Sequence, residues 1–150
     1  MKGKKKVIYV SSPHTKDAEI MKRLSACCRF LIELNFVPVS PCLLYSKCLD
    51  LDCSVESCTV LNCGQRLLEM CDELWYFNFE TKSFTGNDIT LEIAAAKRLN
   101  IPIVNGLHYL ETYEAELRPK YEKWRSKEQD ARQILSIIDK CIEDPKNDNT

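Results

Sequence analysis

Short apolar segments alternate with segments of helical periodicity along most of the chain. Residues 6–11 (KVIYVS) are apolar and β-branched and run into Ser-Ser-Pro, a pattern that predicts a buried strand followed by a turn. Residues 17–34 follow with apolar side chains at helical spacing, which predicts the first helix. The same patterns predict further strands at 37–40, 73–79 and 101–104 and further helices at 59–71 and 88–99.

Three segments fall outside this alternation. Residues 43–57 are irregular and rich in cysteine, so we expect a long loop with one helical turn; long loops in compact domains are often functional lids. Residues 81–87 are polar and contain Gly86, which predicts a second loop. Residues 108–142 carry an aromatic stripe and then an aliphatic one, which predicts one or two amphipathic helices before a polar tail.

The predicted order of elements is β-α-β-α-β-α-β and then helix. Strands that alternate with helices are typical of a parallel sheet with helices on both faces, and the nearly continuous apolar strands fit burial on both sides. The chain has 150 residues, without a repeat or an interdomain linker, which suggests one domain. We expect an α/β fold: a doubly wound, mainly parallel Rossmann-like sheet over residues 1–106, with residues 107–150 as a C-terminal helical extension of the same domain.

The charge and hydropathy of the chain limit which partners and which cellular compartment we expect. The formal net charge is -1, so no overall basic field favours nucleic acid. The four lysines at positions 2, 4, 5 and 6 predict a solvated lead-in to the first strand, with an anion-collecting role as the alternative. No apolar run is long enough to span a membrane and no secretion signal is recognisable, so we expect a cytoplasmic protein that binds no membrane.

Cysteine is unusually frequent, with nine residues. An odd number without a secretion signal argues against a disulfide framework. Cys53, Cys58 and Cys63 recur every five residues, whereas zinc sites usually pair cysteines about two to four residues apart. We therefore expect scattered free thiols rather than a metal or cluster site.

Candidate ligand-binding residues follow from the fold. In open α/β sheets, ligands bind beyond the carboxyl ends of the strands. The residues that the predicted topology brings to this edge are Tyr9, Ser11, Ser12 and His14 after the first strand, Ser40 and Cys42 after the second, Asn78 with its flanking phenylalanines after the third, and Asn87, Asp88 and Glu92 around the start of the last helix.

Glu92 has two interpretations. The first is a surface or capping glutamate, because the helix dipole favours a carboxylate near a helix start. The second is a carboxylate nucleophile of the kind that forms covalent sugar intermediates. Asp88 lies four residues earlier and shares its helix face, so the pKa values of the two carboxylates can separate and leave one able to carry a proton. Asp72 opens the third strand at the opposite end of the sheet, which predicts a structural role.

Four segments carry a resemblance to a known family: VIYVSSP, FVPVSPCLL, CDELWYF and ITLEIAAAKRLNIPIV. In their order and spacing, residues 6–104 resemble the nucleoside 2-deoxyribosyltransferase superfamily, whose enzymes cleave or exchange the N-glycosidic bond of 2'-deoxynucleosides or their monophosphates. The resemblance implies Glu92 as the nucleophile, Tyr9 as the tyrosine that contacts it, and Ser11 and Ser12 as contacts to sugar or phosphate. It also implies an oligomer and no metal or cofactor.

The chain departs from the family pattern in several places. Asp88 stands where the family usually has glycine, Cys42 where its close branch often has histidine, and Ser57-Cys58 where that branch often has Arg-Glu. Residues 62–65 (NCGQ) lack the acid that the transferases carry on that helix.

Two main hypotheses follow. In the first, the chain is an enzyme in which Glu92 attacks C1', Tyr9 orients Glu92 and Asp88 protonates the leaving base, while Ser11, Ser12, His14, Asn78 and Asn87 bind substrate. In the second, it is a module that binds a nucleotide or an ADP-ribose-like signal without chemistry. A purely structural or protein-interaction role is a remoter third. The C-terminal aromatic stripe further predicts a homo-oligomer.

Overall fold

A four-stranded, entirely parallel sheet forms the centre of the molecule. The computed structural model describes residues 3–79 and 88–112. Its sheet has the order β2-β1-β3-β4. The strands and helices in chain order are β1 (Val7–Ser11), α1 (Ala18–Glu33), β2 (Val37–Val39), α2 (Pro41–Tyr45), α3 (Ser54–Leu68), β3 (Glu73–Tyr76), α4 (Asp88–Arg98) and β4 (Ile103–Asn105). The predicted α/β class and parallel sheet are confirmed.

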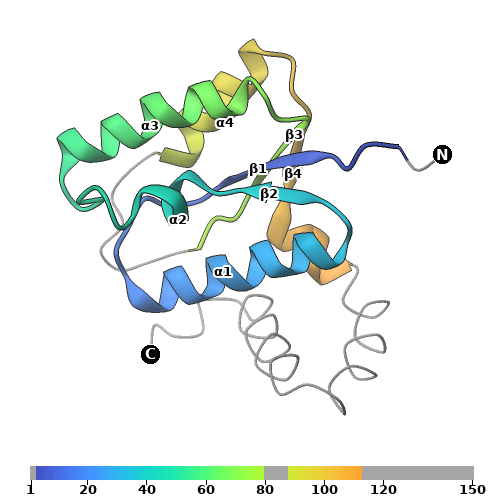
Figure 1. The fold of residues 1–150 in the computed structure, drawn as a ribbon, viewed down its shortest axis with the longest axis horizontal. Coiled ribbons are helices and arrows are strands. Elements are labelled where there is room, and N and C mark those ends of the chain that lie inside the picture. The colour runs from blue at the N-terminus through green and yellow to red at the C-terminus, as the bar shows by residue number, and fades with distance from the viewer. Residues whose placement is uncertain (1–2, 80–87, 113–150) are drawn as a thin grey trace.

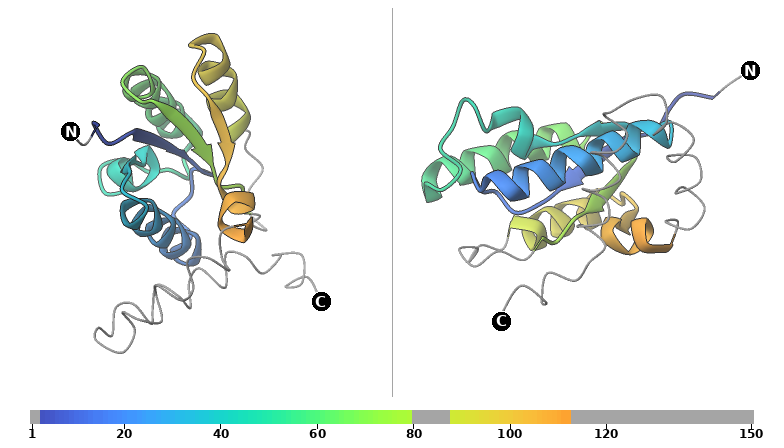
Figure 2. Two further views of the ribbon diagram at one scale, coloured as in Figure 1. Left: turned by 90° about the vertical axis from the view of Figure 1, so that its right-hand side faces the viewer. Right: turned by 90° about the horizontal axis from the view of Figure 1, so that it is seen from below.

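Helices cover both faces of this sheet, as Figures 1 and 2 show: α1 lies on one face, and α3 and α4 lie on the other. The alternation of side chains along β1 explains this arrangement. Ile8 and Val10 pack in the core that contains the buried face of α1, whereas Tyr9 packs with Leu68 of α3 and Ala95 of α4. Every residue of β1 after Val7 is buried, as expected for a central strand covered on both sides.

The connections reverse direction at β1. The chain leaves β1 through α1 to reach β2 on one side, and then passes through α3 to β3 on the other side. This point lies between β1 and β3, where Ser11 is the register partner of Tyr76. The loops that leave two such strands diverge to opposite faces, and the crevice between them is the usual ligand site of doubly wound folds.

The region after β2 differs from its prediction. Pro41 does not merely end the second strand; it begins the short helix α2, and the side chain of Ser40 caps that helix by accepting a hydrogen bond from the backbone N–H of Leu43. Proline suits a first helical position because the N–H that it lacks would have no partner there. Helix α3 also begins at Ser54, five residues before the predicted start, so the expected long loop is shorter.

β3 and α3 each end three residues before their predicted ends, at Tyr76 and Leu68, and most other boundaries agree with expectation. Asp17 caps α1 through its side chain, and Asn35 and Asn100 adopt left-handed backbone conformations just after α1 and α4. Asp72 has the predicted structural role, because its carboxylate accepts the backbone N–H of Val7 at 2.8 Å. Residues 106–112 are helical; the rest of the predicted C-terminal extension, 113–150, lies outside the described residues. No helix in the described part is long and apolar enough to cross a membrane.

Candidate functional site

Glu92 is a buried carboxylate held by side chains of β1. It lies in the second turn of α4 and is 3% exposed. The hydroxyl of Tyr9 donates a hydrogen bond to its Oε2, and the hydroxyl of Ser11 donates to its Oε1 at 3.0 Å. Tyr9 and Ser11 alternate along β1 and therefore face the same side of the sheet, the side that α4 covers. Hydrogen bonds to an ionised acceptor are among the stronger ones in proteins, so this pair fixes the carboxylate.

His14 and Asp88 extend this cluster. The backbone N–H of His14 donates to Oδ2 of Asp88 at 3.2 Å, and the ring Nδ1 lies 3.7 Å from Oδ1 of the same carboxylate. The other ring nitrogen, Nε2, lies 3.6 Å from Oε1 of Glu92. Asp88 and Glu92 are one helical turn apart, so the loop after β1 reaches both carboxylates at once.

Burial and charge shift the pKa values of two members of the cluster. The pKa of Tyr9 rises far above its ordinary value, because burial and the neighbouring Glu92 both disfavour a phenolate. For His14, burial disfavours the imidazolium, but the contact with Glu92 and the charges of Glu92 and Asp88 outweigh it, and its pKa is raised. Tyr9 therefore stays a hydrogen-bond donor at physiological pH.

Ser57 joins the cluster from α3. Its hydroxyl oxygen lies 3.4 Å from Nδ1 of His14, the nitrogen that also faces Asp88. Sequence reasoning named Ser57 only as a departure from the family pattern and assigned it no role. No sequence motif pointed to the contact, which depends on how the start of α3 sits against the loop after β1.

The other predicted binding residues in the described part of the chain make no hydrogen bond to Glu92. Ser12 is buried, and its hydroxyl donates a long hydrogen bond of 3.5 Å to the carbonyl of Pro13. The thiol of Cys42 also points to the carbonyl of Pro13, at 3.6 Å. Asn78 follows β3 and is exposed, and Asn87 lies outside the described residues. The cluster thus contains Tyr9, Ser11, His14, Asp88 and Glu92 from the predicted set.

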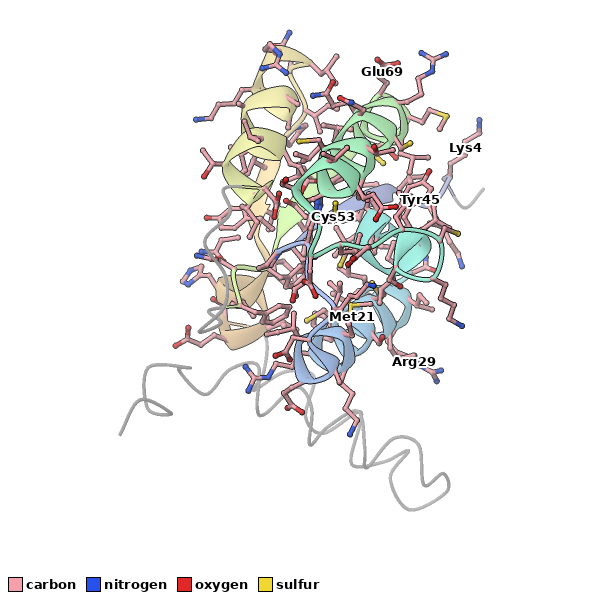
Figure 3. The ribbon with its side chains drawn as sticks, turned by 90° about the vertical axis from the view of Figure 1, so that its left-hand side faces the viewer. Lys4, Met21, Arg29, Tyr45, Cys53 and Glu69 are labelled. Carbon is pink, nitrogen blue, oxygen red and sulfur yellow. The ribbon has the colours of Figure 1, made fainter. Side chains whose placement is uncertain are left out.

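A cleft of about 220 Å³ opens between α3 and α4, which Figure 3 shows side by side with Cys53 at the start of α3. Tyr9 and Glu92 form part of its lining, so the cleft gives access to the buried carboxylate. The remaining lining residues are Cys58, Leu61, Asn62, Gln65 and Leu68 from α3 and Leu91, Ala94, Ala95 and Arg98 from α4.

The two helices present these residues in matching patterns. On each helix, four of the lining residues follow the i, i+3, i+4, i+7 spacing of one helix face. These are positions 58, 61, 62 and 65 on α3 and positions 91, 94, 95 and 98 on α4. The exposed polar side chains that line the cleft are those of Asn62, Gln65 and Arg98. The sequence analysis did not identify these residues as the lining of a cleft. Their shared spacing becomes a usable signal only when the two helices are known to be neighbours.

Gly64 allows α3 to approach the cluster closely. A Cβ atom at this position would lie 2.4 Å from the hydroxyl oxygen of Tyr9 and 3.6 Å from Cγ of Pro41. Real Cβ atoms essentially never approach an oxygen so closely, and the ring of Tyr9 is 1% exposed and cannot swing away freely. The absence of a side chain at Gly64 therefore lets the Tyr9 hydroxyl reach Glu92.

The chemistry of this arrangement is that of an oriented carboxylate. The described residues contain no group of three or more histidine, cysteine, aspartate or glutamate side chains suited to a metal ion. Glu92 instead has two hydroxyl donors and an adjacent imidazole, and it borders an accessible cleft. A carboxylate so placed can act as a nucleophile or as an anchor for a hydroxyl-bearing ligand.

Comparison with known proteins identifies the family of the chain. A family model described as a domain of unknown function (DUF7768) matches residues 6–106, which include the whole sheet, the Glu92 cluster and the cleft. The match covers about two thirds of the chain, so the chain belongs to this family. No curated protein matches the sequence.

Proposed function

We propose that this member of the DUF7768 family acts on the N-glycosidic bond of a deoxynucleoside or deoxynucleotide, with Glu92 as the nucleophile. One observation carries the proposal: Glu92 is a buried carboxylate that Tyr9 and Ser11 hold in place beside a cleft. The position at the switch point of a doubly wound sheet supports a small-molecule site there. The resemblance of residues 6–104 to the 2-deoxyribosyltransferases supports the choice of substrate.

The proposed reaction has two steps. An oxygen of Glu92 bonds to C1' of the sugar while the bond from C1' to the base nitrogen breaks, and its electron pair leaves with the base. The departing base takes a proton from the Asp88–His14 pair, which holds one exchangeable proton between its two groups. Water or a second base then attacks C1' as the bond from C1' to Glu92 breaks, and the proton of the attacking group returns to the Asp88–His14 pair, giving hydrolysis or transfer respectively.

The cleft offers a site for the base. Leu61 and Leu91 line it with apolar surface for a flat ring, while the amides of Asn62 and Gln65 each carry both donors and an acceptor for its polar edge. The volume of about 220 Å³ is below the usual range of sites for whole drug-sized ligands, so we expect the cleft to hold the base and the Glu92 cluster to hold the sugar.

A panel of deoxynucleosides and their 5'-monophosphates tests this function, with chromatography detecting free base. We expect release of base by the unmodified protein and a loss of more than about 100-fold in Glu92→Gln, because glutamine keeps the shape but cannot serve as the carboxylate nucleophile. Glu111→Gln, a change at an exposed glutamate in the helix of residues 106–112, is the matched control. Full turnover in Glu92→Gln would exclude Glu92 as the nucleophile.

A second candidate is a module that binds a nucleotide or an ADP-ribose-like ligand without reaction. The amides of Asn62 and Gln65 favour it, because the α3 wall carries no carboxylate where the transferases have an acid. Calorimetry separates the two candidates: tight binding without release of base, across the whole panel, would favour the module.

We also propose that the protein is a cytoplasmic homo-oligomer. The oligomer is proposed from the aromatic stripe of the C-terminal segment, most of which lies outside the described residues.

A further inference from the structure

His14 occupies an unusual position between two carboxylates. Its Nδ1 lies 3.7 Å from Oδ1 of Asp88, and its Nε2 lies 3.6 Å from Oε1 of Glu92. Its side chain is 2% exposed, so bulk water does not separate these groups. Each ring nitrogen therefore faces a carboxylate oxygen on a different turn of α4.

This geometry selects the protonated ring. A neutral imidazole carries one N–H, so one of its nitrogens would turn a lone pair toward a carboxylate. The imidazolium carries an N–H on both sides and attracts both carboxylates, and the oxygen of Ser57 gives Nδ1 a further acceptor at 3.4 Å. Tyr9 is itself a titratable member of the cluster, Cys42 interacts with the charges of Glu92 and Asp88 from nearby, and burial raises the pKa values of both. Both side chains therefore stay neutral, and His14 is the one group among them that can carry the positive charge.

We propose that His14 is the proton store of the site: its imidazolium holds Glu92 and Asp88 as two ionised carboxylates and gives up its proton when Glu92 becomes an ester. The proposal rests on the function proposed above and deepens it by assigning the exchangeable proton of the Asp88–His14 pair to His14. His14 does not line the cleft, so it is a positioning residue that acts through the carboxylates.

The charges of the cluster explain why His14 releases its proton when the ester forms. Before the reaction, the cluster holds one positive and two negative charges. Formation of the ester consumes the negative charge of Glu92, and one of the two attractions that keep the proton on His14 disappears. At the same moment the departing base carries the electron pair of the broken bond and needs a proton. The proton passes from His14 through Asp88 or a water molecule to the base.

Nuclear magnetic resonance of the histidine rings in the full chain tests the proton store without any need for turnover. The chain has only two histidines, and His108 is exposed, so His108→Gln assigns both signals. We expect His14 to titrate at a higher pH than His108. Glu92→Gln, which resembles the uncharged ester, should lower the His14 midpoint by about one pH unit or more, as loss of a close charge partner does. An His14 midpoint at or below that of His108, or one that Glu92→Gln leaves unchanged, would overturn the inference.

The pH profile of base release gives the second test. His14→Gln keeps a donor near the position of Nε2 but carries no charge. We expect kcat/KM to fall by about tenfold or more, the cost of losing one charged partner of the nucleophile, and the basic limb of the profile to disappear. His108→Gln is the control and should keep the profile. A basic limb that persists in His14→Gln would contradict the role.

The two tests also separate this inference from the proposed function. If no compound of the panel releases base, the proposed function fails, and the titration of His14 still shows whether the ring stores a proton between the carboxylates. If base is released but His14 titrates like an exposed histidine, the inference fails and Glu92 keeps its role.

Discussion

At the scale of residues, the cluster depends on pairs that contact across long stretches of sequence. Tyr9 and Glu92 were each selected from the sequence, Tyr9 by its strand and Glu92 by its place at the start of a helix, and the structure brings them into hydrogen-bond contact. The contact of His14 with both carboxylates was not predictable, because it depends on the course of the loop after β1. Ser57 had no sequence signal of its own.

Replacing Tyr9 by phenylalanine should destabilise the protein and reduce its activity. The change removes a buried donor to a charged acceptor, which typically costs about 1.5–3 kcal/mol of stability. Denaturation in urea measures the loss, with Tyr76→Phe on β3 as the control for a tyrosine with no role in the cluster. Equal effects of the two changes would mean that the Tyr9 hydroxyl contributes nothing specific.

Folding stability should depend on pH through His14. Its pKa is higher in the folded protein than the ordinary 6.5. A group with a raised folded pKa contributes its full stability below the unfolded pKa and loses it as the pH rises through the folded pKa. The unfolding free energy of the unmodified protein should therefore fall, relative to that of His14→Gln, as the pH rises from about 6.5 into the mildly alkaline range.

Urea titrations of both proteins between about pH 5.5 and about pH 9, at fixed ionic strength, measure this difference. The lower limit lies about one unit below the ordinary histidine pKa, and the upper limit lies about two units or more above it. A difference that stays constant across this range, or that grows with pH, would contradict the linkage.

At the scale of elements, the pairing of α3 with α4 makes the cleft, and the start of α3 was predicted five residues too late. Its first residues, Ser-Val-Glu-Ser-Cys, include several poor helix formers, and the side chain of Cys53 makes no capping hydrogen bond. Packing of the helix against the sheet therefore outweighs weak local signals. Pro41 was misjudged for the opposite reason, since a strong strand-ending signal concealed its role at the start of α2.

Gly64→Ala should destabilise α3, although alanine is normally the better helix former by about 0.5–1 kcal/mol. The new Cβ would meet the hydroxyl oxygen of Tyr9 at 2.4 Å, and overpacking of this kind costs about 1–3 kcal/mol. The exposed change Thr59→Ala serves as the control for helix propensity in the same helix.

The double variant Gly64→Ala, Tyr9→Phe identifies the cause of that loss. Without the hydroxyl, the nearest ring atom, Cζ, would lie at an ordinary contact distance of 3.5 Å from the Cβ. We expect Gly64→Ala to cost less in the phenylalanine background, with a coupling energy of about 0.5–3 kcal/mol from the double-mutant cycle. Additive effects would show that the alanine is harmful for another reason.

At the scale of the whole molecule, two exposed thiols test whether a ligand enters the cleft, one as the probe and the other as the reference. Cys48 and Cys58 are both exposed, but only Cys58 lines the cleft. Partly or fully buried thiols should react slowly, because burial raises the pKa of Cys28 to about 12 and that of Cys71 to about 11. Among the thiols of the described residues, alkylation of the native protein, read by mass spectrometry, should therefore modify Cys48 and Cys58 first.

A bound nucleoside should slow alkylation of Cys58 and leave that of Cys48 unchanged. The comparison is internal to one sample, so a general change in stability would affect both thiols alike. Slowing of both, or of neither, at a ligand concentration that saturates binding would place the ligand outside the cleft.

The proposed oligomer is testable at the same scale. Light scattering at micromolar concentration should give a mass of at least two chains, and truncation after residue 112, which removes most of the aromatic stripe, should return the mass to that of one chain. A single-chain mass for the full protein would refute the proposal.

The long separation of the contacts around Glu92 has a consequence for how the protein matures. Tyr9 and Glu92 are 83 residues apart, and His14 and Asp88 are 74 residues apart. Contacts of such high sequence separation form late, because the chain must first close a long loop. During synthesis, the first half of the cluster leaves the ribosome well before α4 exists. A nascent chain therefore cannot capture its ligand, and only a chain that has completed the sheet and docked α4 gains the stability that ligand binding provides.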